Sequence, residues 1–525
     1  MRSRILWVDD EIEHLEPQIL HLTAKGFEVL SARHPSEAMD ILTRQPIDLL
    51  IVDEHMPGMD GIEVTRRVKK LQPHLPVIMV TKDEEESLLE SAVGIDIADF
   101  LIKPVSPQQL FSACRRILSK AILQQQQAHL DYQRDFRRIA TILAFDPTLE
   151  EWYAIYKELV YWDIALEKSE ASEIREILDG QRTEANLRFC RFFVQNYLEW
   201  VHTAQRPTLS PDVLPRFFLP HIGSRPKEAV VLILIDGMRY DQWKVLESLI
   251  APYYYVAEEH LFFSILPTAT QYARNSLFSG LFPLEIAQRY PRYWADDDEE
   301  GGKNLFEEEF FGDLLSRHKL PPKVAYEKVL RPEESRSLLQ RLPQILQQNS
   351  VVVLIFNFLD LLAHTRVQMN ILKELAANDI GLRATTRAWL ETSAVLQVLR
   401  LLPQYVSQVF ITTDHGFVQV KRPVRVMGDR ETTTNLRYKQ GRNLSFDKEE
   451  KSVFHIRKPE EGKLPRATAS STYLFAMEDR FLVYPTNYND YVRLYKDSYQ
   501  HGGVSLEEII VPFVRLEVKG SASNG

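Results

Sequence analysis

Apolar runs alternate with amphipathic helical stretches over residues 1–120. The runs are continuous rather than alternating, which is typical of strands buried on both faces of a sheet. Strands separated by helices also require crossover connections. This region is therefore predicted to be a doubly wound α/β domain with a parallel sheet. Four runs mark its strands: Arg4–Val8, Leu49–Val52, Val77–Val80 and Phe100–Ile102.

The pattern changes between residues 121 and 205, where apolar positions recur at helical spacing among strong helix formers. Three stretches show this spacing, and we predict a three-helix bundle that links two larger domains. The proline-rich passage 206–223 then predicts a connector.

An α/β rhythm returns over residues 224–518 and predicts a second, larger α/β domain. Three of its apolar strands end in an aspartate, at Asp236, Asp360 and Asp414. The polar residues 519–525 predict a disordered tail.

Composition narrows the class of protein. The formal net charge of -10 argues against a general affinity for nucleic acid over the whole surface. The two cysteines, Cys114 and Cys190, are too few for a disulfide framework or a thiolate zinc site. No apolar run reaches the roughly 18 residues that a membrane span needs, and the N-terminus lacks the pattern of a signal peptide. We expect a cytoplasmic protein.

Charged residues and one threonine of the first domain follow its predicted strands. Loops at the carboxyl ends of parallel strands share one crevice. Three carboxylates gathered there repel one another, so the crevice favours a divalent cation with oxygen ligands, most simply Mg²⁺. Asp53 is then the expected phosphoryl acceptor, with Lys103 neutralising charge and Thr81 bonding the added oxygens. The residues concerned are Asp9, Asp10, Asp53, Thr81 and Lys103.

The segments around these positions, VDDE, VDEHMPGMDG, MVTK and FLIKP, closely resemble those of response-regulator receiver domains. The resemblance covers residues 1–120 and implies a flavodoxin-like fold. It also implies that Thr81 and Phe100 form the switch pair that responds to phosphorylation. A cis peptide between Lys103 and Pro104 is expected as well, and X-Pro bonds adopt cis at small cost.

The second α/β domain carries acids, histidines and one hydroxyl on predicted strand ends and loops. Each of them alone is a weak signal, since an Asp-Gly after a strand is commonly only a turn. Mixed imidazole and carboxylate ligands suit zinc, with Mn²⁺ as second choice, and the set is large enough for two metals. A threonine hydroxyl needs a bound cation before it can attack phosphorus. The set comprises Asp236, Thr270, Asp360, His364, Asp414, His415 and His501.

This ordered set resembles the alkaline phosphatase superfamily in its PglZ-type branch. The resemblance implies that Thr270 is the nucleophile. It assigns one zinc ion to Asp236, Thr270, Asp414 and His415, and the other to Asp360, His364 and His501. The sequence around Thr270 departs from the motif of the sulfatases in this superfamily, which argues against sulfate ester hydrolysis.

The whole arrangement resembles response regulators that join a receiver to a PglZ-type output domain through a helical linker. That resemblance implies a two-component system governing type IX secretion, with a sensor histidine kinase as partner. It also implies a phosphodiesterase that acts on oligonucleotides or cyclic nucleotides. A homodimer formed on phosphorylation is the expected response of the receiver.

Basic residues concentrate between Lys421 and Arg442, soon after the expected metal ligands. A cationic rim would attract a polyanionic substrate, and an aromatic ring there would let a base stack. Arg437, Tyr438 and Lys439 are the candidate substrate-binding residues. A solvated loop or hairpin that contacts a neighbouring domain explains the same charges.

Other functions remain open from the sequence alone. The output domain can be a phosphomonoesterase or phosphomutase of the same superfamily. It can instead be an interaction platform for a sigma factor or for the tail of a secretion-system membrane protein. The acidic balance and the lack of a recognisable recognition helix disfavour direct DNA binding.

Overall fold

The computed structural model contains two compact units, Met1–Arg134 and Asp135–Gly525. The tail predicted to be disordered lies mostly outside the described residues. The structure describes the chain except residues 1–2, 73–74, 83–96, 168–171, 224–227, 295–303, 321–322, 330–331, 366–373, 430–432, 434, 448 and 521–525. Side chains are also left undescribed at residues 70, 119–130, 172, 332–333 and 363–365.

The first unit is built on a five-stranded parallel sheet in the order β2-β1-β3-β4-β5, which confirms the predicted doubly wound fold. A separate apolar core covers each face of the sheet. The second strand lacks an apolar run in the sequence because it lies at the sheet edge with most side chains half-buried. The elements are β1 (Arg4–Val8), α1 (Glu16–Ala24), β2 (Glu28–Ala32), α2 (Pro35–Arg44), β3 (Leu49–Asp53), α3 (Gly61–Leu71), β4 (Val77–Thr81) and β5 (Asp99–Ile102).

Three helices follow, as predicted. Helix α5 (Pro107–Ala144) is one continuous helix. Helix α6 (Leu149–Ala165) begins at a capping box in which Thr148 and Glu151 each bond the other's backbone amide. Helix α7 is Ser172–Trp200. None of the helices that the structure describes is long and apolar enough to cross a membrane.

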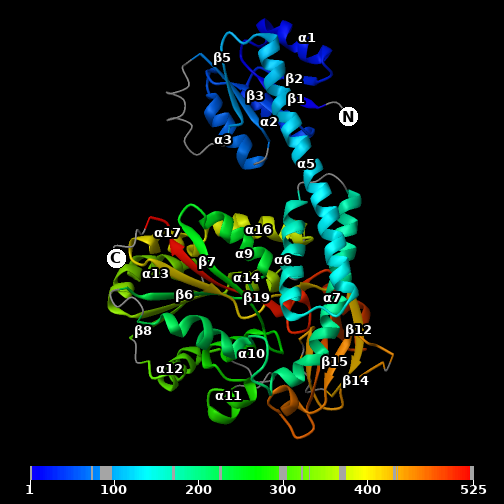
Figure 1. The fold of residues 1–525 in the computed structure, drawn as a ribbon, viewed down its shortest axis with the longest axis vertical. Coiled ribbons are helices and arrows are strands. Elements are labelled where there is room, and N and C mark those ends of the chain that lie inside the picture. The colour runs from blue at the N-terminus through cyan, green and yellow to red at the C-terminus, as the bar shows by residue number, and fades with distance from the viewer. Residues whose placement is uncertain are drawn as a thin grey trace. The chain divides into compact units, whose positions relative to one another are not determined.

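A six-stranded sheet forms the centre of the output domain, in the order β7-β19-β10-β6-β9-β8. Strands β10, β6, β9 and β8 are parallel, whereas β19 runs antiparallel to both of its neighbours. Helices α9 and α16 lie on one face of the sheet, and α10 and α12 on the other (Figure 1). The strands are β6 (Val230–Ile235), β7 (Tyr254–Phe263), β8 (Val324–Val329), β9 (Val351–Phe356), β10 (Gln408–Thr412) and β19 (Ile510–Val518). The helices are α9 (Tyr240–Ile250), α10 (Thr270–Ser279), α11 (Pro283–Arg289), α12 (Glu307–Arg317), α13 (Pro332–Gln348), α14 (Phe358–Thr365), α16 (Asp379–Thr392) and α17 (Ala394–Leu401).

The expected α/β rhythm breaks between β10 and β19, where a mainly β insertion forms small sheets of two or three strands. This insertion leaves the central sheet just after Asp414 and His415 and returns to it at Ile510, nine residues after His501, so it brings two distant histidines to one place. Its elements are β11 (Val418–Gln419), β12 (Arg422–Met427), β13 (Tyr438–Gly441), β14 (Ser445–Phe446), β15 (Val453–Ile456), β16 (Thr472–Ala476), β17 (Arg480–Val483), α18 (Tyr488–Tyr495), β18 (Tyr499–Gln500) and α19 (Leu506–Ile509).

The passage 206–223, predicted as a connector, is packed into the output domain. It forms short helical segments over Ser210–Val213, Leu214–Phe218 and Leu219–His221. Its apolar side chains belong to the core that also contains the central strands. Its prolines therefore mark a change of local conformation rather than an exposed linker.

Candidate functional site

An acidic cluster lies at the carboxyl ends of β1 and β3 in the first unit. Oxygen atoms of Asp9, Asp10 and Asp53 lie within 4.8 Å of one another. The amine of Lys103 lies 2.9 Å from Asp53 Oδ1 and 3.1 Å from Asp9 Oδ2. Burial raises the pKa of Asp53, and the Lys103 hydrogen bond offsets this only in part. A cation bound among these oxygens would favour their ionised forms.

Two further predicted residues flank this cluster. Thr81 is fully buried, and its hydroxyl donates a hydrogen bond to the carboxylate of Glu54. Phe100, on the neighbouring edge strand β5, is half-buried against a receiver core. The peptide between Lys103 and Pro104 is cis, as expected. Thr81 and Lys103 therefore lie at strand ends near the acidic cluster, whereas Phe100 lies within β5.

A second cluster lies at the carboxyl ends of β6 and β10 in the output domain. Asp236 follows β6, and Asp414 and His415 follow β10. Each of the three offers a ligand atom within 4.8 Å of the others. All three side chains are almost completely buried. This group matches three of the four residues expected at one zinc ion.

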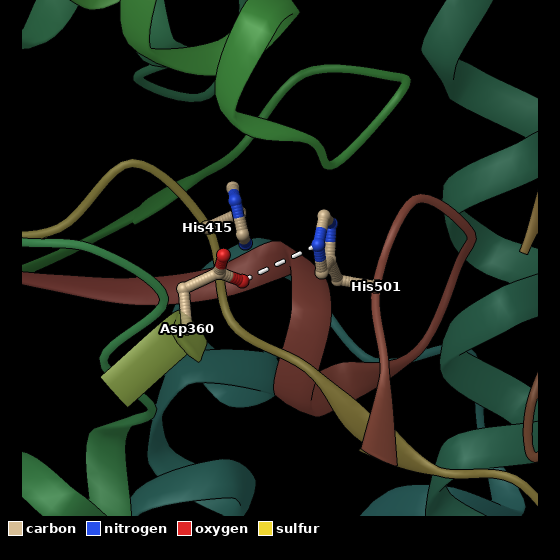
Figure 2. A group of neighbouring side chains, drawn as sticks. All are labelled: Asp360, His415 and His501. Atoms are coloured by element: carbon tan, nitrogen blue, oxygen red, sulfur yellow. Dashed lines mark ion pairs between the residues drawn. The ribbon is translucent and has the colours of Figure 1, made fainter. Parts of the chain in front are cut away.

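A third cluster shares His415 with the second. It adds Asp360 from α14 and His501 from the loop after β18, again within 4.8 Å. Figure 2 shows the three side chains pointing toward one another, with His501 Nε2 3.3 Å from Asp360 Oδ1. The rings of His415 and His501 stack with centroids 4.3 Å apart. His415 thus lies between two potential ligand groups, whereas the prediction assigned it to one.

Backbone carbonyls orient both histidines. His415 Nδ1 lies 3.0 Å from the carbonyl of Gly416, and His501 Nδ1 lies 3.0 Å from the carbonyl of Thr268. A carbonyl only accepts, so each Nδ1 carries the proton and donates it. In the neutral form of each ring, Nε2 then carries the lone pair, and in both residues Nε2 lies on the side of the carboxylates. Such a carbonyl contact is the usual support of a metal-binding histidine.

Gly416 permits this arrangement because the backbone passes very close to a neighbouring loop. A Cβ atom at this position would lie 1.9 Å from the carbonyl oxygen of Glu507. Any side chain here would push the His415 loop out of place, so the glycine after the Asp-His pair has a steric role.

The predicted nucleophile lies beside these groups at the start of α10. Thr270 Oγ1 is 3.2 Å from His415 Nε2 and 3.4 Å from Asp236 Oδ1. The hydroxyl therefore borders the ligand atoms of the Asp236 group. This contact brings together residues that are 34 and 145 positions apart in the sequence.

Arg274 is a site residue that the sequence analysis missed. It lies one helical turn after Thr270 and is 1 % exposed. Its guanidinium pairs with Asp236, and its Nε lies 2.9 Å from Asp414 Oδ2. Glu307, which is fully buried, faces the same guanidinium at 3.6 Å. The only signal in the sequence is the four-residue spacing from Thr270 to Arg274, which puts both on one helix face.

Burial and charge act differently on the two aspartates beside Arg274. Burial and the charges of Asp414 and Asp360 raise the pKa of Asp236 well above its usual range, despite the guanidinium. Burial also acts on Asp414, but Arg274, His415 and backbone amides outweigh it and lower the pKa of that carboxyl. A divalent cation between them would hold both carboxylates ionised.

The donor set fits metal ions. In their neutral forms the two imidazoles would aim lone pairs at buried carboxylates, and such groups repel unless a proton or a metal ion lies between them. His364 falls in α14, but its side chain lies outside the described residues. The structure thus assembles six of the seven residues predicted for the output site: Asp236, Thr270, Asp360, Asp414, His415 and His501.

The three candidate substrate-binding residues are buried rather than exposed at a rim. Arg437 is 0 % exposed and pairs with Glu508 at 2.6 Å. Tyr438 packs edge-on against Tyr272, with ring centroids 6.0 Å apart. Lys439 is 2 % exposed and lines a cavity that contains none of the proposed metal ligands. Because Arg437 is buried and paired, the structure does not support a substrate-guiding role for it. The density of charges along the sequence does not reveal which side chains are buried.

Fold and sites define a response-regulator receiver joined by a helical linker to an alkaline phosphatase-like domain. The family model described as the BREX system PglZ alkaline phosphatase-like domain matches residues 219–516, more than half of the chain, and the chain belongs to this family. The response regulator receiver domain model matches residues 5–115. The model of the PorX response regulator linker domain matches residues 122–201, so the three parts have the PorX architecture.

Curated relatives share only part of their length with this chain. The cyclic di-GMP phosphodiesterase response regulator RpfG of Xanthomonas campestris is 32% identical over 118 residues, 22% of this chain and 31% of RpfG. The phosphate regulon transcriptional regulatory protein PhoB of Pseudomonas aeruginosa is 35% identical over 120 residues, 22% of this chain and 52% of PhoB. The chain therefore spans about a third to a half of these relatives. A receiver domain from Clostridium thermocellum has 32% identity and a TM-score of 0.22, and the match covers 23% of this chain and 98% of that one.

Receiver domains are typically phosphorylated by sensor histidine kinases. Both receiver and alkaline phosphatase-like domains typically bind metal ions. The chain therefore combines a two-component input with an output domain of a hydrolase superfamily.

Proposed function

We propose that the output domain is a two-zinc phosphodiesterase with Thr270 as its nucleophile, controlled by phosphorylation of Asp53. The observation that carries the proposal is the position of His415, which is common to two three-residue ligand groups and 3.2 Å from the Thr270 hydroxyl. One ion would bind Asp236, Asp414 and Thr270, and the other Asp360, His364 and His501. His415 is near enough to serve either ion, and the family pattern assigns it to the first.

Thr270 would act by in-line attack on phosphorus. Its Oγ1 forms a bond to phosphorus, the first alcohol leaves, and a phosphothreonine ester remains. Water then cleaves that ester and restores the threonine. When bound, the zinc ions stabilise the ionised hydroxyl and the charge on the phosphate oxygens. Arg274 holds Asp236 and Asp414 in place behind the nucleophile.

We propose that Mg²⁺ binds Asp9, Asp10 and Asp53 in the receiver, and that a sensor histidine kinase supplies the phosphoryl group. Thr81, Phe100 and Lys103 would then respond to it, and the phosphorylated chain would form a homodimer. From the family resemblance, we propose that the chain controls type IX secretion and that its substrates are oligonucleotides or cyclic nucleotides. The donor set at Asp53 supports the first step, because all three metal-facing groups are carboxylates.

The test is metal removal and return with a matched pair of substrates. The full chain is stripped with a chelator, reloaded with zinc, and assayed on bis(p-nitrophenyl) phosphate and p-nitrophenyl phosphate. We expect about two zinc ions per chain, recovery of activity on reloading, and a higher kcat/KM for the diester. A higher value for the monoester would indicate a phosphomonoesterase. Zinc-loaded protein that hydrolyses neither ester would favour an interaction platform for a sigma factor or a membrane-protein tail.

A further inference from the structure

A cavity in the β insertion is separate from the proposed metal site. Its volume is about 520 Å³, and it shares no residue with the three acidic clusters. Leu436, Leu482, Val483, Tyr484 and Tyr491 supply much of its wall. Cavities of roughly 300–1,000 Å³ with mostly apolar walls are typical of small-molecule sites.

Lys439 brings a cationic group to this wall. Its side chain is 2 % exposed, and its Nζ lies 4.5 Å from the ring centroid of Tyr484. Successive side chains of a strand point to opposite faces. Tyr438 packs close to Gly502 beside the His501 loop, so Lys439 faces away from that loop.

No carboxylate pairs with Lys439 among the residues that the structure describes. Asp429, the acid on the cavity wall, instead lies 3.8 Å from Arg442 and accepts hydrogen bonds from Asn443. Burial lowers the pKa of Lys439 to about 7, because no negative charge offsets the loss of water. The amine is therefore a buried basic group for which the described part of the chain supplies no counter-charge, and an anion beside it would favour its charged form.

A ligand that carries an acid group would supply that counter-charge. The Tyr484 ring beside the amine and the aliphatic side chains around it would pack against a flat apolar body. A neutral apolar ligand would leave the amine without a counter-ion. A strongly hydrated inorganic ion would leave most of the apolar wall without contacts.

We propose that this cavity binds a small organic anion, with its acid group paired to Lys439 and its flat apolar body packed against Tyr484 and Leu482. The ligand site lies within the insertion, and the proposal does not depend on the esterase activity. Binding can therefore be measured on the full chain without substrate or zinc.

The test compares two fluorescent probes that share one ring system. 8-Anilinonaphthalene-1-sulfonate carries an acid group, and N-phenyl-1-naphthylamine does not. We expect Lys439→Met to raise the Kd of the sulfonate probe at least tenfold while the Kd of the neutral probe changes less than twofold. Lys496→Met, at an exposed lysine of the same insertion, is the matched control and leaves both Kd values unchanged.

A second variant tests the cavity without touching the lysine. Thr486 lines the cavity and is exposed, so Thr486→Trp adds bulk at the opening without disturbing the core. We expect it to weaken binding of both probes. Unchanged sulfonate binding in Lys439→Met and in Thr486→Trp, with both proteins folded by circular dichroism, would overturn the proposal.

Discussion

The receiver cluster and the output cluster both gather aspartates at the carboxyl ends of parallel strands, but they differ in burial and in the neighbouring cation. In the receiver, the side chain of Lys103 is 17 % exposed and reaches two carboxylates. In the output domain, the side chain of Arg274 is 1 % exposed and bridges Asp236 and Asp414. A partly exposed cation suits a phosphoryl group that arrives and leaves, whereas a buried cation beside buried carboxylates suits resident ions.

The receiver site and the output site also differ in the types of ligand atom that they offer. The receiver offers only carboxylate oxygens, which suit Mg²⁺. The output site adds the imidazoles of His415 and His501, which suit zinc. Clustered acids alone therefore do not identify a metal. The two sites are distinguished by their burial and by the nitrogen ligands that accompany the acids in the output domain.

The largest expected effect follows from His415→Ala, which removes the residue common to both output groups. We expect diester turnover to fall by roughly 10³-fold or more, with the zinc content reduced from about two ions per chain. Metal content is measured by inductively coupled plasma mass spectrometry.

Asp53→Asn is the reciprocal control for this comparison. It should abolish labelling by acetyl phosphate and leave the zinc content intact, whereas His415→Ala should leave labelling intact. Loss of zinc in Asp53→Asn would show that the two clusters are not independent.

Arg274→Met tests the buried cation. It leaves Asp236 and Asp414 without their shared partner, and breaking a buried ion pair costs about 3–5 kcal/mol. We expect that loss in the unfolding free energy of the zinc-free protein and a smaller loss in the zinc-loaded protein, since the metal ion supplies positive charge. Thermal unfolding with and without zinc provides the measurement.

Arg341→Met serves as the matched control, because Arg341 pairs with Glu327 at 3.0 Å but its side chain is 51 % exposed. Its loss should cost less than about 1 kcal/mol in either state. Equal destabilisation by Arg274→Met with and without zinc would contradict the assigned relation between the guanidinium and the metal.

Arg437→Met tests whether Arg437 contacts the substrate or instead supports the residues near His501. Arg437 pairs with Glu508, which also accepts a hydrogen bond from the amide of Gly503 near His501. We expect kcat to fall by roughly 10–100-fold, as for residues that orient metal ligands. The fall should be the same for a dinucleotide and for bis(p-nitrophenyl) phosphate. A loss confined to the dinucleotide would restore the substrate-guiding role.

Lys439→Met gives the smallest expected effect on turnover, and its effect is on the pH dependence of stability. The pKa of Lys439 is about 7 in the folded chain and 10.5 when exposed. Folding therefore disfavours the protonated amine. The free-energy cost of folding with this amine grows as the pH falls from 10.5 to 7 and is constant below that. We expect Lys439→Met to stabilise the chain by roughly 3 kcal/mol more at pH 6 than at pH 9.5. An equal gain at both pH values in thermal unfolding would contradict an unpaired amine.

The sequence predicted several aspartates of both sites because strand ends of a parallel sheet meet at one edge. Asp9, Asp53, Asp236 and Asp414 were all found from their places after apolar runs. The fold class followed from the same periodicity.

What the sequence could not predict depends on burial and tertiary packing. Arg274 looked like an ordinary helical cation, and Arg437 like a surface one, since charge along the chain does not reveal which side chains are enclosed. Strand β2 at the sheet edge had no apolar run, and the β insertion was hidden within an assumed α/β rhythm. Short strands in small sheets have weak periodic signals, and tertiary contacts decide them.

The most direct test of the central claim is the diesterase rate of Thr270→Ala beside Thr270→Ser, with bound zinc quantified in both and in the unmodified chain. If Thr270 is the nucleophile, the alanine variant retains zinc but loses turnover, while the serine variant, which keeps a hydroxyl, retains measurable turnover. An alanine variant that hydrolyses the diester at the unmodified rate would contradict a threonine nucleophile.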